Sequence, residues 1–317
     1  MKILAVDDDR VFLDLLVPML HSSGEDDVTV ALSAVEALGH ISHATDAYDC
    51  ILLDIQMPEI NGIQLCRAIR ELADYKRTPI VMITAMSTKA YIDDAFTAGA
   101  TDYVTKPLDR QELRARLGMV QRLLDERRSS AAMAQQYYNR TNVVTVDVDF
   151  ETPFLVEGFS RGMEYLALEN YLLTLGNKKL HAMTALGFHV ENASQIMRKG
   201  NPAKFVAMLS DVAAVIEDAI KTEQMMISYA GSGDFVGVFT SVTACDSEEL
   251  EAQINAGLAE FESIYASELL PLPRVKVGSV VKSSFFASFK SAAILTRAID
   301  LARGNRGRLA KERWYAA

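Results

Sequence analysis

Three aspartates stand directly after short apolar runs in the N-terminal part of the sequence. Asp7 and Asp8 follow the run 3–6, and Asp54 follows the run 50–53. If these runs are strands of a parallel sheet, their carboxyl ends meet at one edge, where ligands bind in such folds. Three converging carboxylates repel one another unless a proton or a hard divalent cation joins them. We therefore expect a Mg²⁺ site, since Mg²⁺ prefers oxygen ligands.

Two further polar residues stand at strand ends of the same region. Thr84 follows the apolar run 80–83, and Lys106 follows the run 103–104. A hydroxyl and an ammonium can stabilise phosphoryl oxygens, and an aspartate beside Mg²⁺ can accept a phosphoryl group. Taken singly, each of these residues is more often a capping or solvated group. Their joint order predicts phosphoryl transfer to a carboxylate.

An alternation of strands and helices must position these residues. Continuous apolar strands are typical of a sheet buried on both faces, and strand-helix alternation implies right-handed crossovers between parallel strands. Pro18 lies inside the first helical pattern, so we expect a kinked or shortened helix there. The expected strands are 3–6, 28–31, 50–53, 80–83 and 103–104, and the expected helices are 10–20, 34–41, 63–72, 90–98 and 112–124.

The motifs that carry these residues closely resemble those of the receiver domain of bacterial response regulators. They are Val6-Asp7-Asp8, the stretch 52–62, Ile83-Thr84-Ala85 and the stretch 103–107. The resemblance implies a flavodoxin-like α/β fold with a five-stranded parallel sheet, and a histidine kinase, phosphotransfer protein or small phosphodonor as the source of the phosphoryl group. The implied roles are phosphoacceptor for Asp54, metal ligands for Asp7, Asp8, Asp54 and the backbone carbonyl of Gln56, phosphoryl sensing for Thr84 and Lys106, and switch aromatic for Tyr103.

Two residues near these motifs have plainer interpretations. Tyr103 is either the switch or simply a core residue, which is the usual role of an aromatic on a strand. Asp9 is adjacent to the metal carboxylates, but we interpret it as the N-cap of the helix that begins at Arg10.

The end of the last helical pattern sets the domain boundaries. Leu113, Leu117, Val120 and Leu124 share a 4-3-4 spacing, after which the sequence becomes charged and polar. This face packs on the first domain or, less commonly for so few heptads, forms a short dimerising coil. The boundaries that we expect are a receiver domain at 1–124, a helical linker at 125–141 and an output domain at 142–317.

The C-terminal part of the sequence shows a different order of elements. Alternating apolar residues at 144–148 and a helical stretch at 161–175 precede the apolar run 183–190. An N-cap and first-turn proline at Asn201-Pro202 start the next helix. The order β-α-β-β-α-β is typical of the ferredoxin-like, split β-α-β fold of the α+β class. The expected later elements are strands 225–229 and 235–240, a helix after 247–249, a strand 275–281 and a helix 292–303.

The predicted hairpin in this region reads Gly231-Ser232-Gly233-Asp234-Phe235, which resembles the GGDEF domain of diguanylate cyclases. Active members use hairpin acids to hold metal ions that align two nucleoside triphosphates. In this chain Ser232 replaces the second Gly, Gly233 the Asp and Asp234 the Glu, so two acids become one. The resemblance therefore implies a degenerate GGDEF-like output domain.

Active GGDEF domains also carry two spaced acids on the first core strand, and this chain lacks that pair. In one register the family's acid positions fall on His189 and Glu191, and in another on Ala185 and Gly187; we prefer the first. His189, Glu191 and Asp234 are then either an unusual metal site or ordinary exposed and turn residues.

Two arginines at the end of the last helix complete this resemblance. Arg303 and Arg308 match basic positions of the family's closing pattern, although the spacing is one residue longer. They contact phosphates or form a solvated helix end.

Composition and charge exclude other classes of protein. The 317 residues are 50% hydrophobic, too apolar for a disordered chain and too long for one core. With 32 basic against 42 acidic residues and neither half net basic, no nucleic-acid module is expected. No apolar run reaches the roughly 18 residues of a membrane helix. The run before the aspartates 7–9 is too short for a signal peptide, so we do not expect secretion. Three scattered cysteines fit a reducing cytoplasm.

The leading hypothesis is a two-component response regulator whose C-terminal domain acts without cyclase chemistry. It would bind a protein effector or a nucleotide; whether GTP or cyclic di-GMP binds is left open. Phosphorylation would alter homodimerisation or partner access through the helix at 112–128. The alternative is an active diguanylate or other nucleotidyl cyclase controlled by the receiver. Direct DNA binding is the weakest hypothesis, since no helix-turn-helix pattern is present.

Overall fold

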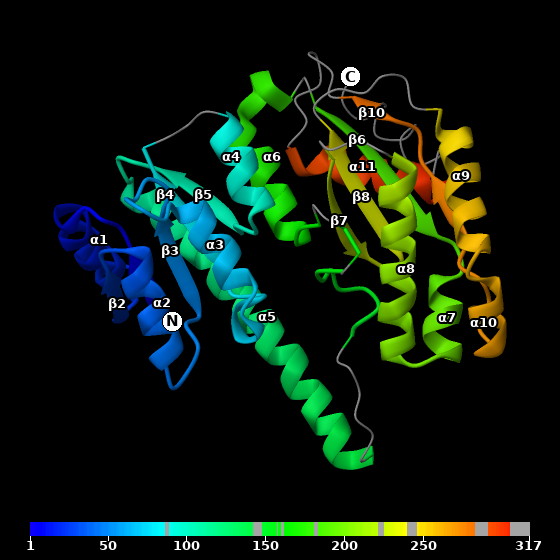
Figure 1. Cartoon of the computed structure of the whole chain (residues 1–317), viewed down its shortest axis with the longest axis horizontal. Helices are drawn as coiled ribbons and strands as arrows, with labels where there is room; N and C mark the ends of the chain where they lie inside the picture. Colours follow the sequence, from blue (N-terminus) through cyan, green and yellow to red (C-terminus); the bar gives the residue numbers. More distant parts are fainter. Residues whose placement is uncertain are drawn as a thin grey trace, which may run out of the picture. The chain divides into compact units, whose positions relative to one another are not determined.

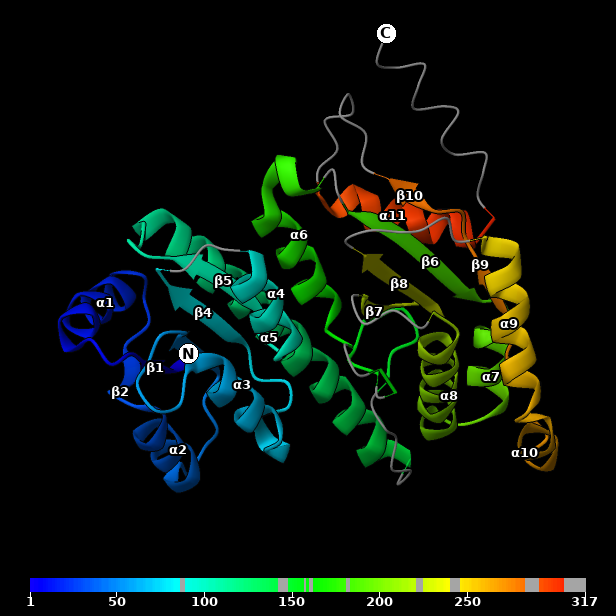
Figure 2. The same ribbon diagram turned by 45° about the horizontal axis from the view of Figure 1, so that its top comes forward.

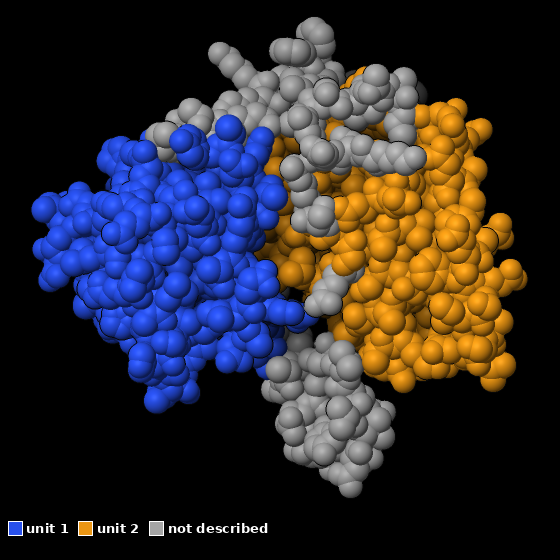
Figure 3. Space-filling model, in the orientation of Figure 1, with its two compact units in different colours: residues 1–140 blue, residues 141–317 orange. Residues whose placement is uncertain are grey.

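The computed structural model divides the chain into two compact units, Met1–Arg140 and Thr141–Ala317 (Figures 1 and 3). Each unit is built around its own sheet. Among the described residues, no helix is long and apolar enough to cross a membrane. The structure describes residues 1–85, 89–141, 148–156, 158–159, 162–180, 183–220, 225–239, 246–282 and 291–304.

A parallel sheet forms the centre of the first unit. Its strands are β1 (Lys2–Val6), β2 (Asp27–Ala31), β3 (Cys50–Asp54), β4 (Ile80–Thr84) and β5 (Asp102–Thr105). They follow the order β2-β1-β3-β4-β5, which confirms the predicted flavodoxin-like sheet. Every residue of β3 and β4 is buried, which explains their continuous apolar sequences.

Helices pack on both faces of this sheet. They are α1 (Arg10–Ser22), α2 (Ala34–His43), α3 (Gly62–Arg70), α4 (Lys89–Thr97) and α5 (Arg110–Thr141), with a 3-10 turn at Ala73–Tyr75. Helices α1 and α5 share a core with alternate residues of β1, β3 and β4. Leu113, Leu117 and Val120 of α5 belong to that core, which confirms that this face packs on the first domain.

Helix α1 begins as predicted and ends later than predicted. The Asp9 carboxylate accepts hydrogen bonds from the backbone N–H groups of Val11 (2.9 Å) and Phe12 (3.3 Å), which confirms its N-cap role. Pro18 does not shorten the helix, which continues to Ser22. Pro18 is exposed, so the carbonyl one turn before it can be hydrated.

Helix α5 continues through the segment 125–141 that the sequence assigns to a linker. Arg128 donates a hydrogen bond to the Asp49 carboxylate at 2.7 Å, and Arg127 donates one to the backbone carbonyl of Arg77. Both acceptors lie in segments that lead into strands of the first unit. The first turn of the expected linker is therefore attached to the first unit.

An antiparallel sheet forms the centre of the second unit. Its strands are β6 (Thr184–Val190), β7 (Met226–Gly231), β8 (Asp234–Phe239), β9 (Val275–Val277) and β10 (Val281–Lys282). Their order is β10-β6-β8-β7, and β9 also pairs with β6. The single strand expected at 275–281 is thus two short strands, because the chain is interrupted at Gly278 where α11 (Ser291–Ala302) lies against it.

Helices cover both faces of this second sheet. Besides α11 they are α6 (Tyr165–Leu180), α7 (Ala193–Lys199), α8 (Pro202–Ile220), α9 (Ser247–Ala259) and α10 (Glu262–Ser267). Figures 1 and 2 show α7, α8 and α9 on one side of the sheet and α6 and α11 on the other. Leu186, Phe188 and Val190 of β6 belong to the core under α8 and α9, so the alternate residues of β6 face α11.

Helix α11 lies directly on β6 at a position without a side chain. A Cβ atom at Gly187 would lie 2.2 Å from the carbonyl oxygen of Ala298. A Cβ atom at Gly278 would similarly lie 2.8 Å from the backbone nitrogen of Ala302. The two glycines therefore let the helix backbone approach the sheet, and this places Arg303, the next residue, near the end of β6.

Candidate functional site

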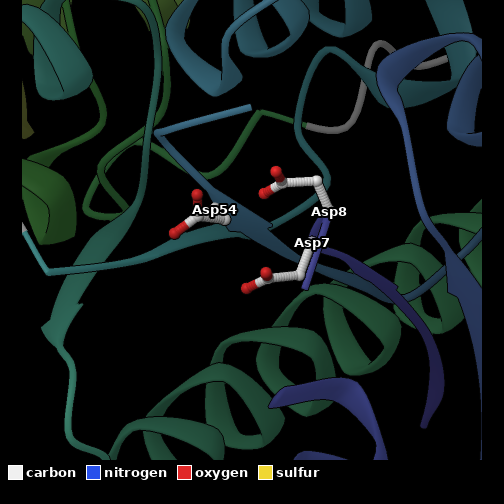
Figure 4. A group of neighbouring side chains, drawn as sticks. All are labelled: Asp7, Asp8 and Asp54. Carbon is white, nitrogen blue, oxygen red and sulfur yellow. The ribbon is translucent and has the colours of Figure 1, made fainter. Parts of the chain in front are cut away.

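Three carboxylates lie together at the carboxyl ends of β1 and β3 (Figure 4). Oxygen atoms of Asp7, Asp8 and Asp54 all lie within 4.8 Å of one another. Asp7 and Asp54 are only 2% and 3% exposed, whereas Asp8 is exposed. Val6 pairs with Leu53 across the two strands, and this register brings the following residues to one place. The structure thus brings together the three acids identified in the sequence.

Lys106 bridges two of these carboxylates. Its Nζ atom lies 2.6 Å from Asp7 Oδ2 and 3.1 Å from Asp54 Oδ1. Burial tends to lower the pKa of Lys106, but the hydrogen bonds with the two carboxylates outweigh it, so the pKa is raised. Burial raises the pKa of Asp54, although Lys106 opposes that effect. Three carboxylates therefore face one ammonium, and the cluster carries an excess of negative charge.

The loop between β3 and α3 closes tightly over Asp54. The backbone N–H of Gln56 donates to Asp54 Oδ2 at 2.7 Å. A Cβ atom at Gly62 would lie 2.0 Å from the backbone oxygen of Asp54, so only glycine fits at the start of α3. Glu59 adopts a φ of 64°, a left-handed conformation that this loop requires. These contacts fix the orientation of the Asp54 carboxylate; the ligand role of the Gln56 carbonyl stays a prediction.

Thr84 lies on β4, next to β3, and Tyr103 lies on β5, at the edge of the sheet beyond β4. Thr84 is fully buried at the end of β4, and its backbone carbonyl accepts a hydrogen bond from the Lys106 N–H at 2.8 Å. Tyr103 is 2% exposed, and its hydroxyl has no hydrogen-bond partner among the described residues. Burial raises the pKa of Tyr103. This placement agrees with a core role, and the switch role stays a prediction.

The donor set of the acidic cluster fits Mg²⁺. Its three side-chain donors are carboxylate oxygens, and Mg²⁺ is commonly bound through one or two carboxylates together with water molecules. The exposed Asp8 provides the side from which a hydrated cation can approach.

Comparisons with known proteins agree with this geometry. Residues 3–118 match the response regulator receiver domain family. Response regulator MprA of Mycobacterium bovis is 34% identical over 140 residues, covering 44% of this chain and 59% of MprA. Hybrid signal transduction histidine kinase L of Dictyostelium discoideum is 38% identical over 117 residues, covering 36% of this chain and 7% of that kinase. The chain thus spans less than two thirds of these relatives.

A solved structure matches the same region. The chemotaxis protein CheY4 of Vibrio cholerae is 31% identical, with a TM-score of 0.35, and the match covers 38% of this chain and 97% of CheY4. The family match, the relatives and the sheet order lead to one conclusion: residues 3–118 are a receiver domain of two-component response regulators.

In the second unit, the hairpin aspartate is enclosed by basic side chains. Asp234 is 1% exposed and lies opposite His189 in the pairing of β6 with β8. His189 Nδ1 lies 2.8 Å from Asp234 Oδ1. Arg303 donates to Asp234 Oδ2, from Nε at 2.8 Å and from a terminal nitrogen. The hydrogen bond with Asp234 raises the pKa of Arg303. Arg303 therefore contacts a carboxylate of its own chain, and Arg308 lies outside the described residues.

Glu191 lies apart from this group. Its carboxylate pairs with Lys276 at 3.0 Å, and both side chains are exposed. Among the described residues, the only group of three or more possible metal ligands is the one formed by Asp7, Asp8 and Asp54. The structure thus brings His189 and Asp234 together and does not bring Glu191 to them.

The alternative register on β6 has no room for acids. Gly187 lies beneath the backbone of α11, and Ala185 is fully buried. The packing of α11 explains why this strand carries small residues on that face.

The hairpin turn has an unusual backbone conformation, which two of its residues explain because they are glycines. Gly231, Ser232 and Gly233 all adopt positive φ values, of 86°, 56° and 81°. A Cβ atom at Gly231 would lie 2.1 Å from the backbone oxygen of Glu151. Phe235 is fully buried. The two glycines are therefore required by conformation and close packing.

The sequence analysis missed a buried ion pair at the start of β5, the end of that strand away from the acidic cluster. Asp102, at the start of β5, is 1% exposed, and Arg116 Nη1 lies 3.2 Å from its carboxylate. Burial raises the pKa of Asp102 to about 6, although Arg116 opposes the shift. The signal in the sequence was a charged residue next to an apolar strand, which is a weak one.

Proposed function

We propose that the chain is a cytoplasmic two-component response regulator that accepts a phosphoryl group on Asp54. A histidine kinase or a phosphotransfer protein would supply it. The observation that best supports this proposal is the arrangement of Lys106 between Asp7 and Asp54, with the exposed Asp8 beside them. An acid cluster with one fixed ammonium is suited to bind a divalent cation together with a phosphoryl group.

In the proposed reaction, an oxygen of the Asp54 carboxylate attacks the phosphorus atom of the donor. The bond from phosphorus to the donor breaks, and an acyl phosphate forms on Asp54. Asp7, Asp8, Asp54 and the Gln56 carbonyl would hold Mg²⁺, which when bound neutralises phosphoryl oxygens. The Gln56 N–H and Lys106 orient the attacking carboxylate.

After transfer, Lys106 and Thr84 would contact the phosphoryl oxygens. Thr84 ends β4, the neighbour of β3, Lys106 follows β5, the neighbour of β4, and the Lys106 N–H is bonded to the Thr84 carbonyl. A dianionic group at this edge would draw the two residues toward it and bias the adjoining loops, with Tyr103 as the proposed switch.

Phosphorylation of the full chain by acetyl phosphate and Mg²⁺, followed by intact mass spectrometry, tests this proposal. We expect an acid-labile phosphate on the wild type and none on Asp54→Asn. Asp8→Asn should reduce labelling strongly, whereas Asp9→Asn is the matched control, because asparagine also caps a helix. Equal labelling of Asp54→Asn would overturn the assignment.

We further infer that residues 142–317 form a ferredoxin-like, GGDEF-type domain without cyclase activity. The strand order β10-β6-β8-β7, with helices between β6 and β7 and between β8 and β9, supports the ferredoxin-like interpretation. The tight turn at Ser232 and Gly233 lies where the hairpin motif is expected.

The surroundings of Asp234 support the loss of activity. A catalytic hairpin acid must be available to a metal ion. Here both carboxylate oxygens of Asp234 are bonded, one to His189 and the other to Arg303. The domain would then signal by binding a protein effector or a nucleotide.

The activity is tested by incubating the full chain with GTP, Mg²⁺ or Mn²⁺ and beryllium fluoride and separating the products by chromatography. We expect no cyclic dinucleotide. A product that is lost in Asp234→Ala would instead establish the cyclase alternative.

The regulatory step is tested on the phosphorylated and unphosphorylated chain. We expect the two forms to differ in molar mass by light scattering or in capture of an effector. If both properties are identical, phosphorylation does not control this output.

A further inference from the structure

The ammonium of Lys106 has an aromatic neighbour in addition to its two carboxylates. Its Nζ atom lies 4.0 Å from the centre of the Phe12 ring. An ammonium within about 6 Å over an aromatic face is attracted by the negative potential of that face. The ring therefore contributes to the position of the Lys106 ammonium in the acidic cluster.

Both partners of this contact are attached to rigid elements. Phe12 lies in the first turn of α1, where its N–H donates to the Asp9 cap, and its side chain packs partly buried against the core of the first unit. Leu13 and Leu16 anchor the same helix in that core. On the other side, the Lys106 backbone is bonded to Thr84. The contact thus joins the start of α1 to the end of β5.

The Phe12 ring can still attract the Lys106 ammonium when Mg²⁺ is bound to the carboxylates. Asp7 and Asp54 contact Lys106 here, yet both are also proposed ligands of Mg²⁺. A lysine side chain has many rotamers and loses much conformational freedom when it is fixed. An aromatic face attracts the ammonium without using a carboxylate oxygen.

We propose that Phe12 is a positioning residue that keeps the Lys106 ammonium beside Asp54 for phosphoryl transfer. The proposal rests on the proposed phosphoacceptor role of Asp54. Phe12 acts through Lys106 and does not itself touch the phosphoryl group.

Two substitutions of Phe12 separate the aromatic face from the apolar volume. Phe12→Leu keeps an apolar side chain and removes the ring, whereas Phe12→Tyr keeps the ring. We expect Phe12→Leu to lower the initial rate of phosphorylation by acetyl phosphate about 3- to 10-fold, and Phe12→Tyr to stay within about 2-fold of the wild type. Met19→Ala is the control, since Met19 packs partly buried from α1 against the same core; its rate should be unchanged.

A second measurement reports the contact independently of phosphoryl transfer. In the full chain labelled with ¹³Cε-lysine, the ring current of Phe12 should shift the Lys106 methylene protons upfield. Lys106→Arg identifies the signal by its loss. The shift should persist in Phe12→Tyr and disappear in Phe12→Leu.

The outcomes separate this proposal from the one on which it rests. Equal rates for Phe12→Leu and wild type, equally slow rates for Phe12→Leu and Phe12→Tyr, or the absence of an upfield shift would each overturn the role of Phe12. If the upfield shift is present but neither the wild type nor any variant is phosphorylated on Asp54, the phosphoacceptor assignment fails instead.

Discussion

Asp54 in the first unit and Asp234 in the second are both buried aspartates at strand ends, and both contact a cationic side chain. Asp54 shares the single ammonium of Lys106 with Asp7, and Asp8 stands exposed beside them. Among the described residues, Asp234 pairs with His189 and with the guanidinium of Arg303. The cluster around Asp54 has more carboxylates than cationic groups. The group around Asp234 has at least as many basic side chains as acidic ones.

This difference in charge balance separates a site suited to a ligand from a closed one. Burial raises the pKa of Asp54, so its ionised form is incompletely compensated in the folded chain. A divalent cation or a proton would relieve that excess. The carboxylate of Asp234 is instead bonded at both oxygens, one to His189 and the other to Arg303. The residue type is the same, and the neighbours decide its chemistry.

The largest effects are expected from the glycines that support the two aspartates. Gly62→Ala would place a Cβ atom 2.0 Å from the Asp54 carbonyl oxygen, and Gly187→Ala would place one 2.2 Å from that of Ala298. Each should lower the free energy of unfolding by about 3 kcal/mol or more, since backbone must move. Only Gly62→Ala should also slow phosphorylation of Asp54. Urea unfolding and labelling of the full chain measure the two properties.

Gly39→Ala is the matched control for these variants. Nothing lies within 4 Å of the added Cβ atom, and alanine is favoured over glycine within a helix. It should leave stability unchanged or raise it slightly. If Gly187→Ala unfolds at the same midpoint urea concentration as the wild type, the close packing of α11 on Gly187 is contradicted.

The receiver site could be predicted because its residues sit in short, ordered motifs at strand ends. A parallel sheet places such ends together whatever the details of packing, so Asp7, Asp8, Asp54 and Lys106 were found from their positions alone. Gly62 lies inside one of these motifs, but the sequence does not reveal its close approach to the Asp54 carbonyl, which depends on the folded loop.

The second unit was less predictable because its contacts join distant segments. The order of strands and helices followed from periodicity, and the hairpin turn followed from its glycines. The pairing of Arg303 with Asp234 depends on how α11 rests on Gly187, which no local pattern encodes. The ring of Phe12 over Lys106 was missed for the same reason.

A pH titration tests whether burial of a second carboxylate, that of Asp102, also destabilises the first unit. Burial raises the pKa of Asp102 from 3.8 to about 6. The folded chain then binds a proton more tightly than the unfolded chain, so this residue favours folding at low pH, and the effect is lost as the pH rises from about 4 to 6. The loss is up to about 3 kcal/mol.

The variant Asp102→Asn isolates this effect. It cannot ionise, so the stability of the first unit should vary less between pH 4 and pH 6 than in the wild type, as measured by urea unfolding at each pH. The same slope in both proteins would show that Arg116 compensates the buried charge fully.

Neutralising the two compared aspartates should have opposite effects on stability. Asp234→Asn leaves Arg303 without its carboxylate and should destabilise the second unit by about 2 kcal/mol, less than for a fully buried pair because Arg303 is 37% exposed. Asp54→Asn removes one of three clustered charges and should stabilise the first unit by about 1 kcal/mol. Thermal unfolding of the full chain in Mg²⁺-free buffer compares them. If both substitutions destabilise their units, the negative charge of Asp54 is compensated as fully as that of Asp234.

The smallest effect is expected at Glu191, the acid that the sequence placed beside His189. It forms an exposed pair with Lys276, and such pairs contribute little because solvent screens them. Glu191→Gln should change the free energy of unfolding by less than about 0.5 kcal/mol and leave divalent-metal binding by the full chain unaltered in calorimetry. Asp8→Asn is the counterpart in the first unit, an exposed acid whose neutralisation should weaken that binding. A loss of metal binding in Glu191→Gln would mean that the second unit has its own metal site, and the contrast between the two aspartates would no longer hold.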